Sequence, residues 1–77
     1  MLQRKKKGEI DGVIGERIRR KRLAMRPKMT AADLAQMLGV REGTVLGWEK
    51  GRYEPSIAQI DQIAEKLGTT RNYLVMS

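Results

Sequence analysis

Residues 30–51, TAADLAQMLGVREGTVLGWEKG, form the stretch that most restricts how this chain folds. Thr30 belongs to a helix-capping residue type, and Asp33 stands three positions later, the spacing at which a side chain returns a bond to the cap. Apolar residues then recur at three- and four-residue steps, which is the helical period. Gly39 readily adopts the left-handed conformation that ends a helix. This pattern predicts a short helix over residues 31–38.

The second half of the stretch predicts another short helix, over residues 42–50. Val45 and Trp48 supply its apolar stripe, and Gly51 closes it. Two helices joined by three to four residues that include a glycine have the form of a helix-turn-helix motif. The stretch therefore predicts a helix-turn-helix.

These residues resemble the phage-repressor or XRE-like family of helix-turn-helix proteins. No single dipeptide of the family pattern is specific, but the order and spacing of its parts together match closely. The matching residues are Leu34-Ala35, Leu38-Gly39-Val40, Trp48-Glu49, Gly51 and Pro55-Ser56. The resemblance covers residues 14–75. It implies an all-α fold, a compact domain of five helices around one core, with the helix-turn-helix at helices 2 and 3.

The flanking segments contain signals for the remaining three helices. We expect helix 1 over residues 13–25, ended by Pro27, whose ring clashes with a preceding helical turn. Ser56 is placed to cap helix 4, and Gly68 to end it. Thr70 is placed to cap a last short helix, whose apolar residues either close the core or meet a second subunit.

The length and residue content of the chain limit what it can be. Seventy-seven residues support one small domain. We assign residues 1–12 to a flexible basic arm and residues 13–77 to a single helix-turn-helix domain. The chain has no Cys and no His, which excludes a disulfide framework and the usual zinc ligands, and removes the commonest general base. We expect no enzyme activity, no cofactor and no metal site.

No stretch of the sequence resembles a membrane span, and the basic N-terminus lacks the apolar segment of a signal peptide. We therefore expect no membrane partner and a cytoplasmic, nucleoid-associated protein.

The positive charge of the chain is concentrated in its first third. The formal net charge is +7, and residues 1–28 hold eleven Lys and Arg residues against three acidic ones, whereas residues 29–77 hold five against six. A basic region is typical of a nucleic-acid binder. The alternative is a solvated tail that only improves solubility.

Ten residues are candidate phosphate contacts. Four adjacent cations in the arm would displace counterions from DNA and add salt-sensitive affinity without sequence information. The first turn of helix 2 would present backbone N–H groups and a positive dipole end to an anion, and the resemblance implies that this turn and the turn after helix 3 face the DNA backbone. The candidates are Arg4, Lys5, Lys6, Lys7, Arg26, Lys28, Thr30, Ala31, Lys50 and Arg52. The alternatives are a terminus that touches nothing and a surface loop that is basic by chance.

The face of helix 3 that would read bases is unusual. Direct readout relies on side chains such as Arg, Asn, Gln or Ser reaching base edges, and the positions that match the base-contacting ones of the family are chiefly Glu42, Gly43 and Gly47. Each glycine costs about 1 kcal/mol relative to alanine inside a helix. The two glycines indicate either close approach to a DNA or protein surface, or tolerated drift. The base-facing candidates are Arg41, Glu42, Gly43, Thr44, Leu46 and Gly47.

Arg22 and Glu49 are expected to form a structural pair. In the family, the arginine and glutamate at the matching positions join helix 1 to helix 3. We expect this pair to support the architecture and not to read DNA. Breaking a buried ion pair costs about 3–5 kcal/mol of folding stability.

The sequence is compatible with three functions. The first is a transcriptional regulator that binds double-stranded DNA as a homodimer with helix 3 in the major groove. It would act by occupancy, as a repressor that blocks the polymerase or as an activator that touches it. The second is a low-specificity DNA-associated module. The third is an antitoxin or other protein-interaction subunit that docks a protein partner through Gly43, Leu46 and Gly47. If the chain is complete, no ligand-sensing domain follows residue 77, and regulation comes through concentration, partners or proteolysis.

Overall fold

The computed structural model describes the backbone of residues 10–75 and the side chains of residues 13–75. The fold of this part of the chain is all-α, as the sequence predicted. Its elements are α1 (Ile10–Leu23), α2 (Ala31–Leu38), α3 (Glu42–Glu49), α4 (Ile57–Leu67) and α5 (Arg71–Val75). None of these helices has the length and apolar composition needed to cross a membrane. The candidate phosphate contacts at residues 4–7 lie outside the described residues.

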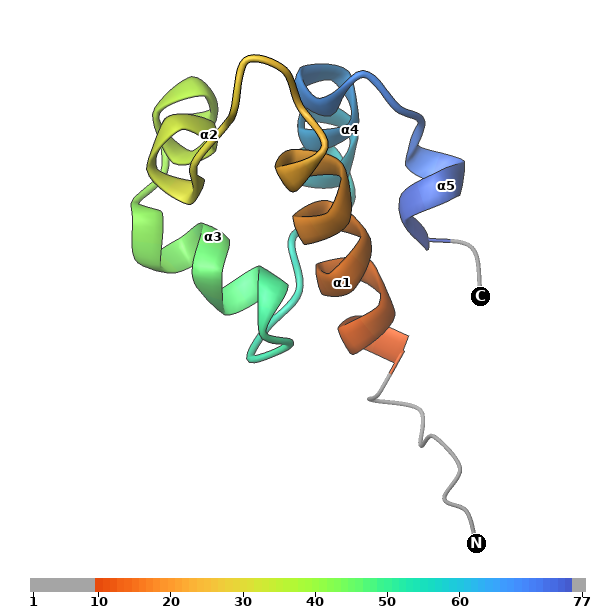
Figure 1. The fold of residues 1–77 in the computed structure, drawn as a ribbon. Helices are drawn as coiled ribbons and strands as arrows, with labels where there is room; N and C mark the ends of the chain where they lie inside the picture. Colours follow the sequence, from red (N-terminus) through yellow and green to blue (C-terminus); the bar gives the residue numbers. More distant parts are fainter. Residues whose placement is uncertain (1–9, 76–77) are drawn as a thin grey trace, which may run out of the picture.

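α1 crosses the middle of the domain, with α2 and α3 on one side and α4 and α5 on the other (Figure 1). α2 packs on α3, while α1 contacts α3, α4 and α5. Five large side chains are fully buried at the centre, one from each helix: Ile18, Leu34, Val45, Ile63 and Leu74. Because every helix contributes to the same core, α2 and α3 are held in place by the whole domain. Leu74 shows that the last helix closes the core of the monomer.

The capping residues predicted from the sequence are present. Thr30 Oγ1 accepts a hydrogen bond from the N–H of Asp33 at 3.0 Å, and Asp33 Oδ2 accepts from the N–H of Thr30 at 2.9 Å. Ser56 and Gln59 form the same reciprocal pair, at 3.1 and 2.8 Å. Gly39 ends α2 with a φ of 73°. Because these contacts satisfy groups that a helix end leaves unbonded, α2 and α4 start at the residues that the sequence indicated.

The range of α1 differs from the predicted residues 13–25. The helix begins three residues earlier, at Ile10, and ends at Leu23. The helix therefore includes residues 10–12, which the sequence assigns to the arm. Gly12 does not prevent this, because a glycine costs only about 1 kcal/mol inside a helix. At the other end, the N–H of Ala24 is shared between the carbonyls three and four residues back, at 3.2 Å each. Pro27 disfavours helical geometry in the residue before it, so the chain leaves the helix early.

Gly15 allows α1 to lie directly against the end of α3. A Cβ atom at this position would meet the carbonyl oxygens of Trp48 and Glu49, the latter at 2.9 Å. These are backbone atoms, which cannot turn aside as the tip of a side chain does. The close approach of α1 to α3 therefore requires a residue without a side chain at this position.

We expect Gly15→Ala to destabilise the domain by about 1–3 kcal/mol, because the added methyl group forces packed backbone atoms apart. Gly43→Ala is the matched control. It makes the same change inside α3, where a Cβ atom meets nothing within 4 Å, and it should stabilise the domain by up to about 1 kcal/mol. Urea unfolding followed by the fluorescence of Trp48 measures both changes. Stabilisation of both variants alike would contradict the close contact between α1 and α3.

Candidate nucleic-acid interface

A buried ion pair joins α1 to the end of α3. Arg22 Nε donates to Glu49 Oε2 at 2.7 Å, and Arg22 Nη2 donates to Glu49 Oε1 at 2.8 Å. The third guanidinium nitrogen, Nη1, donates to the carbonyl of Met29 at 3.1 Å, in the loop before α2. The hydrogen bond to Glu49, together with its charge, raises the pKa of Arg22 above its ordinary value in spite of burial. The expected pair is present, and it holds the loop before α2 as well.

One face of α3 is directed outward. Val45 and Trp48 point into the core, so the residues on the opposite side of the helix face solvent. Arg41, which precedes α3 as its N-cap residue, is exposed, and so are Glu42 and Gly43 in the first turn. Three of the base-facing candidates, Arg41, Glu42 and Gly43, are therefore exposed.

The structure corrects the expectation for Gly47, which is not an open position. Gly47 is buried, because the ring of Tyr53, from the turn after α3, lies where a Cβ atom would be. Leu46 is half-buried and packs against the core, and Thr44 is half-buried too. Tyr53 is therefore a surface residue of this face that was absent from the candidates. The signal that could have indicated it is a pair of glycines four residues apart with an aromatic residue shortly after the helix.

The candidate phosphate contacts outside the arm differ in their surroundings. Lys28, Lys50 and Arg52 are exposed. Arg26 is exposed too, but its Nη1 donates to two carbonyls around the end of α1, at 3.2 and 2.7 Å. Arg26 therefore acts partly as a cap for α1, which is a role the sequence did not predict.

The N-terminus of α2 is occupied by its own capping box. The N–H groups of Thr30 and Asp33 are both bonded inside this box. The bonds from the backbone and the hydroxyl of Thr30 lower the pKa of Asp33, which keeps its carboxylate charged at neutral pH. The side chain of Ala31 is buried. A phosphate approaching this turn would meet a negative charge, so Thr30 and Ala31 are weaker candidates than Lys50 and Arg52.

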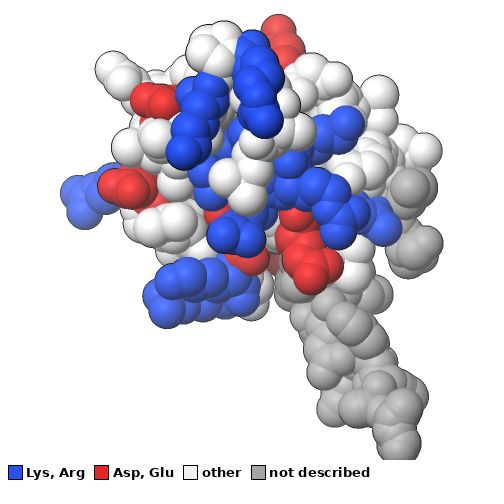
Figure 2. Space-filling model, in the orientation of Figure 1, with Lys and Arg blue, Asp and Glu red and all other residues white. Residues whose placement is uncertain are grey.

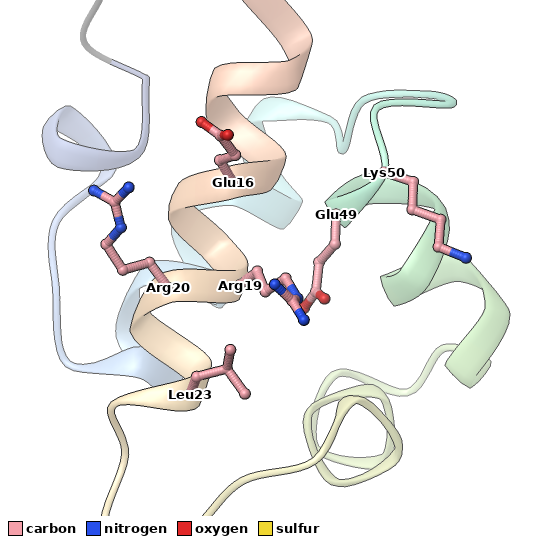
Figure 3. Close-up of a pocket in the computed structure, with 6 residues that line it drawn as sticks. All are labelled: Glu16, Arg19, Arg20, Leu23, Glu49 and Lys50. Carbon is pink, nitrogen blue, oxygen red and sulfur yellow. The ribbon is translucent and has the colours of Figure 1, made fainter.

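An open groove of about 590 Å³ lies on the surface beside the contact between α1 and the end of α3 (Figure 3). Its lining residues are Glu16, Arg19, Arg20, Leu23, Glu49 and Lys50. Arg19 points from α1 toward α3, and Lys50 extends from the other side of the groove, whereas Arg20 points away from α3 (Figure 3). Lys and Arg side chains cover much of the face that carries α1 (Figure 2). The structure thus adds Arg19 to the cations near α3.

The family model described as helix-turn-helix matches residues 18–74. The matched range includes α2 and α3, both residues of the buried ion pair and nearly all of the core. The chain belongs to the XRE-like helix-turn-helix family. The family pattern seen in the sequence therefore corresponds to the fold that the structure has.

Two curated relatives from archaea are similar to this XRE-like chain. One is an uncharacterised HTH-type transcriptional regulator of Methanothermobacter thermautotrophicus, 42% identical over 40 residues, which are 52% of this chain and 58% of the relative. The other is an uncharacterised HTH-type transcriptional regulator of Methanocaldococcus jannaschii, also 42% identical over 40 residues, which are 52% of this chain and 61% of the relative. The chain thus spans about three fifths of the length of these relatives. No solved structure matches it.

We expect the loss of either partner of the ion pair to destabilise the domain strongly. Arg22→Met leaves the carboxylate of Glu49 buried without a partner, and Glu49→Leu leaves the guanidinium in the same position, so each should cost about 3–5 kcal/mol. The double variant removes both charges and should be more stable than either single variant. Urea unfolding of the four proteins measures the coupling. Independent, additive effects of the two substitutions would show that the two charges do not stabilise each other.

Proposed function

We propose that this chain is a DNA-binding transcription regulator that places α3 in the major groove of duplex DNA. Its membership of the XRE-like helix-turn-helix family and the naming of its relatives as transcriptional regulators support this proposal. In helix-turn-helix proteins the second helix of the motif reads base edges while the first crosses the backbone. Here the first turn of α3 is exposed, as such a reader requires.

The observation that carries the proposal is the position of the exposed cations around α3. Arg41 stands just before the helix, and Lys50 and Arg52 follow it, all three exposed. A helix of this length spans about 12 Å, which is close to the width of the major groove. Cations at both ends would then reach phosphates on the two sides of the groove. The acidic residue at the end of α3, Glu49, is neutralised by its buried partner and does not oppose this contact.

The regulator acts in this proposal as a homodimer that represses by occupying a two-fold symmetric site. Ile57 and Val75 support a dimer because both are exposed apolar residues. They line one open groove beside α5. The cations at residues 4–7 would add phosphate contacts that depend on salt but carry no sequence information. Half-sites about one helical turn apart follow from a two-fold arrangement.

The protein-docking alternative is less well supported. Its docking surface was Leu46 between Gly43 and Gly47, and the ring of Tyr53 covers that surface at Gly47. The low-specificity alternative differs from the proposal only in the strength of base readout, which a binding assay measures.

We expect the full chain to bind a duplex selected from random DNA about 10³-fold or more tightly than random duplex. The variant Lys50→Ala/Arg52→Ala should weaken binding to both duplexes and reduce the slope of log K against log salt by about one per lost phosphate contact. Lys66→Ala is the control for each of the single variants Lys50→Ala and Arg52→Ala, since it removes one exposed cation on α4, outside the proposed interface. Fluorescence anisotropy across a range of salt concentrations measures these quantities.

Two results would contradict the proposal or narrow it. If the wild-type chain prefers the selected duplex by less than about tenfold, the low-specificity function replaces operator reading. If Lys50→Ala and Arg52→Ala each bind with the same salt slope as Lys66→Ala, the cations after α3 do not contact phosphate.

A further inference from the structure

The side chain of Tyr53 lies along the outward face of α3. Its hydroxyl donates a hydrogen bond to the carbonyl of Gly43 at 3.3 Å. The tip of the ring, including the hydroxyl oxygen itself, occupies the space beside Gly47, where any Cβ atom would overlap it. The same end of the phenol therefore lies against Gly47 and bonds the carbonyl of Gly43, on the side of α3 that faces away from the core.

The two glycines share the centre of that outward face. Residues four apart on a helix lie one above the other, and the buried residues Val45 and Trp48 lie on the opposite side of the helix. Gly47 provides the room for the ring, while the space beside Gly43 stays open. The ring accounts for the glycine at position 47, where any side chain would overlap it, whereas no neighbouring atom requires a glycine at position 43.

The side chain of Tyr53 packs against α3 but stays partly exposed to solvent. Tyr53 is 49% exposed, so about half of its surface stays accessible although the phenol tip lies against α3. On the outward face of α3 itself, Gly43 and Gly47 have no side chain, and Glu42 can accept a hydrogen bond from a cytosine amino group but cannot donate one.

We propose that Tyr53 is a DNA-contacting residue of the reading surface, and that it takes the place of side chains that α3 itself lacks. This inference rests on the proposed function. The phenolic proton is used on the carbonyl of Gly43, so the oxygen is left to accept a hydrogen bond. In the major groove the donors that it would meet are the amino groups of adenine and cytosine, and the ring edge fits against the methyl group of thymine.

The position of Tyr53 is tested first without DNA. Nuclear Overhauser effects between the Tyr53 ring and the Hα protons of Gly47 should be present in the free chain. Gly47→Ala should abolish the contact with residue 47 by displacing the ring, since the tip of the tyrosine can swing away, whereas the matched Gly43→Ala should keep it. Absence of the contact in the wild-type chain would overturn the proposal.

The second measurement is the affinity for the selected duplex and for random duplex. Tyr53→Ala and Gly47→Ala should each lower affinity for the selected duplex by about fivefold or more, the range of a lost base contact. Affinity for random duplex and the salt slope should stay unchanged, because no charge is lost. Tyr53→Phe should reproduce the part of the loss that is due to the hydroxyl. Tyr73→Phe is its matched control on α5, with no expected effect.

The outcomes separate the inference from the proposed function. If the wild-type chain selects a duplex and Tyr53→Ala binds it equally well, the inference is overturned and the proposed function stands. If Tyr53→Ala weakens binding to all duplexes in parallel with a fall in Tm, the residue is structural and the inference is likewise overturned. If the wild-type chain binds no duplex, both proposals are wrong.

Discussion

The buried bidentate bond between Arg22 and Glu49 determines where α3 lies. It connects α1 to the last residue of α3, and the same guanidinium holds the carbonyl of Met29 in the loop before α2. Such a pair is tolerated inside a protein only when its hydrogen bonds are complete, and no side-chain polar atom is left buried without a partner in the described part of the chain. The close approach of α1 at Gly15 fixes the same end of α3 by steric contact. The ion pair and the close backbone packing thus both fix the C-terminal end of α3 against α1.

With its C-terminal end fixed against α1, α3 presents its opposite face to solvent. The helix turns its outward face to solvent, and on that face the chain supplies an aromatic side chain from outside the helix, Tyr53. The surface proposed to read DNA is then built from α3 and the turn after it, rather than from the helix alone. The exposed cations Lys50 and Arg52 belong to the same turn. The reading and phosphate-binding parts of the proposed interface therefore depend on one short segment.

Local features of this fold could be predicted from the sequence, because caps and helical periodicity depend on neighbouring residues. The Thr30 cap and the glycine that ends α2 are such features. The pair of Arg22 with Glu49 followed only from the resemblance to a family, since its partners are 27 residues apart. The prediction that Gly47 is open to a partner was wrong, because the ring of Tyr53 covers it and the position of that ring depends on the path of the chain after α3. The contact at Gly15 could not be predicted for the same reason: backbone atoms of a distant helix create it.

In the proposed function, α3 is held by its buried ion pair and carries the surface that touches DNA. The most direct test is to titrate the ¹⁵N-labelled chain with its selected duplex and to map the amide chemical shifts. We expect the largest changes in α3 and in the following turn as far as Tyr53. Tight binding of a duplex with the amides of α3 and this turn at the shifts of the free chain would contradict the proposed function.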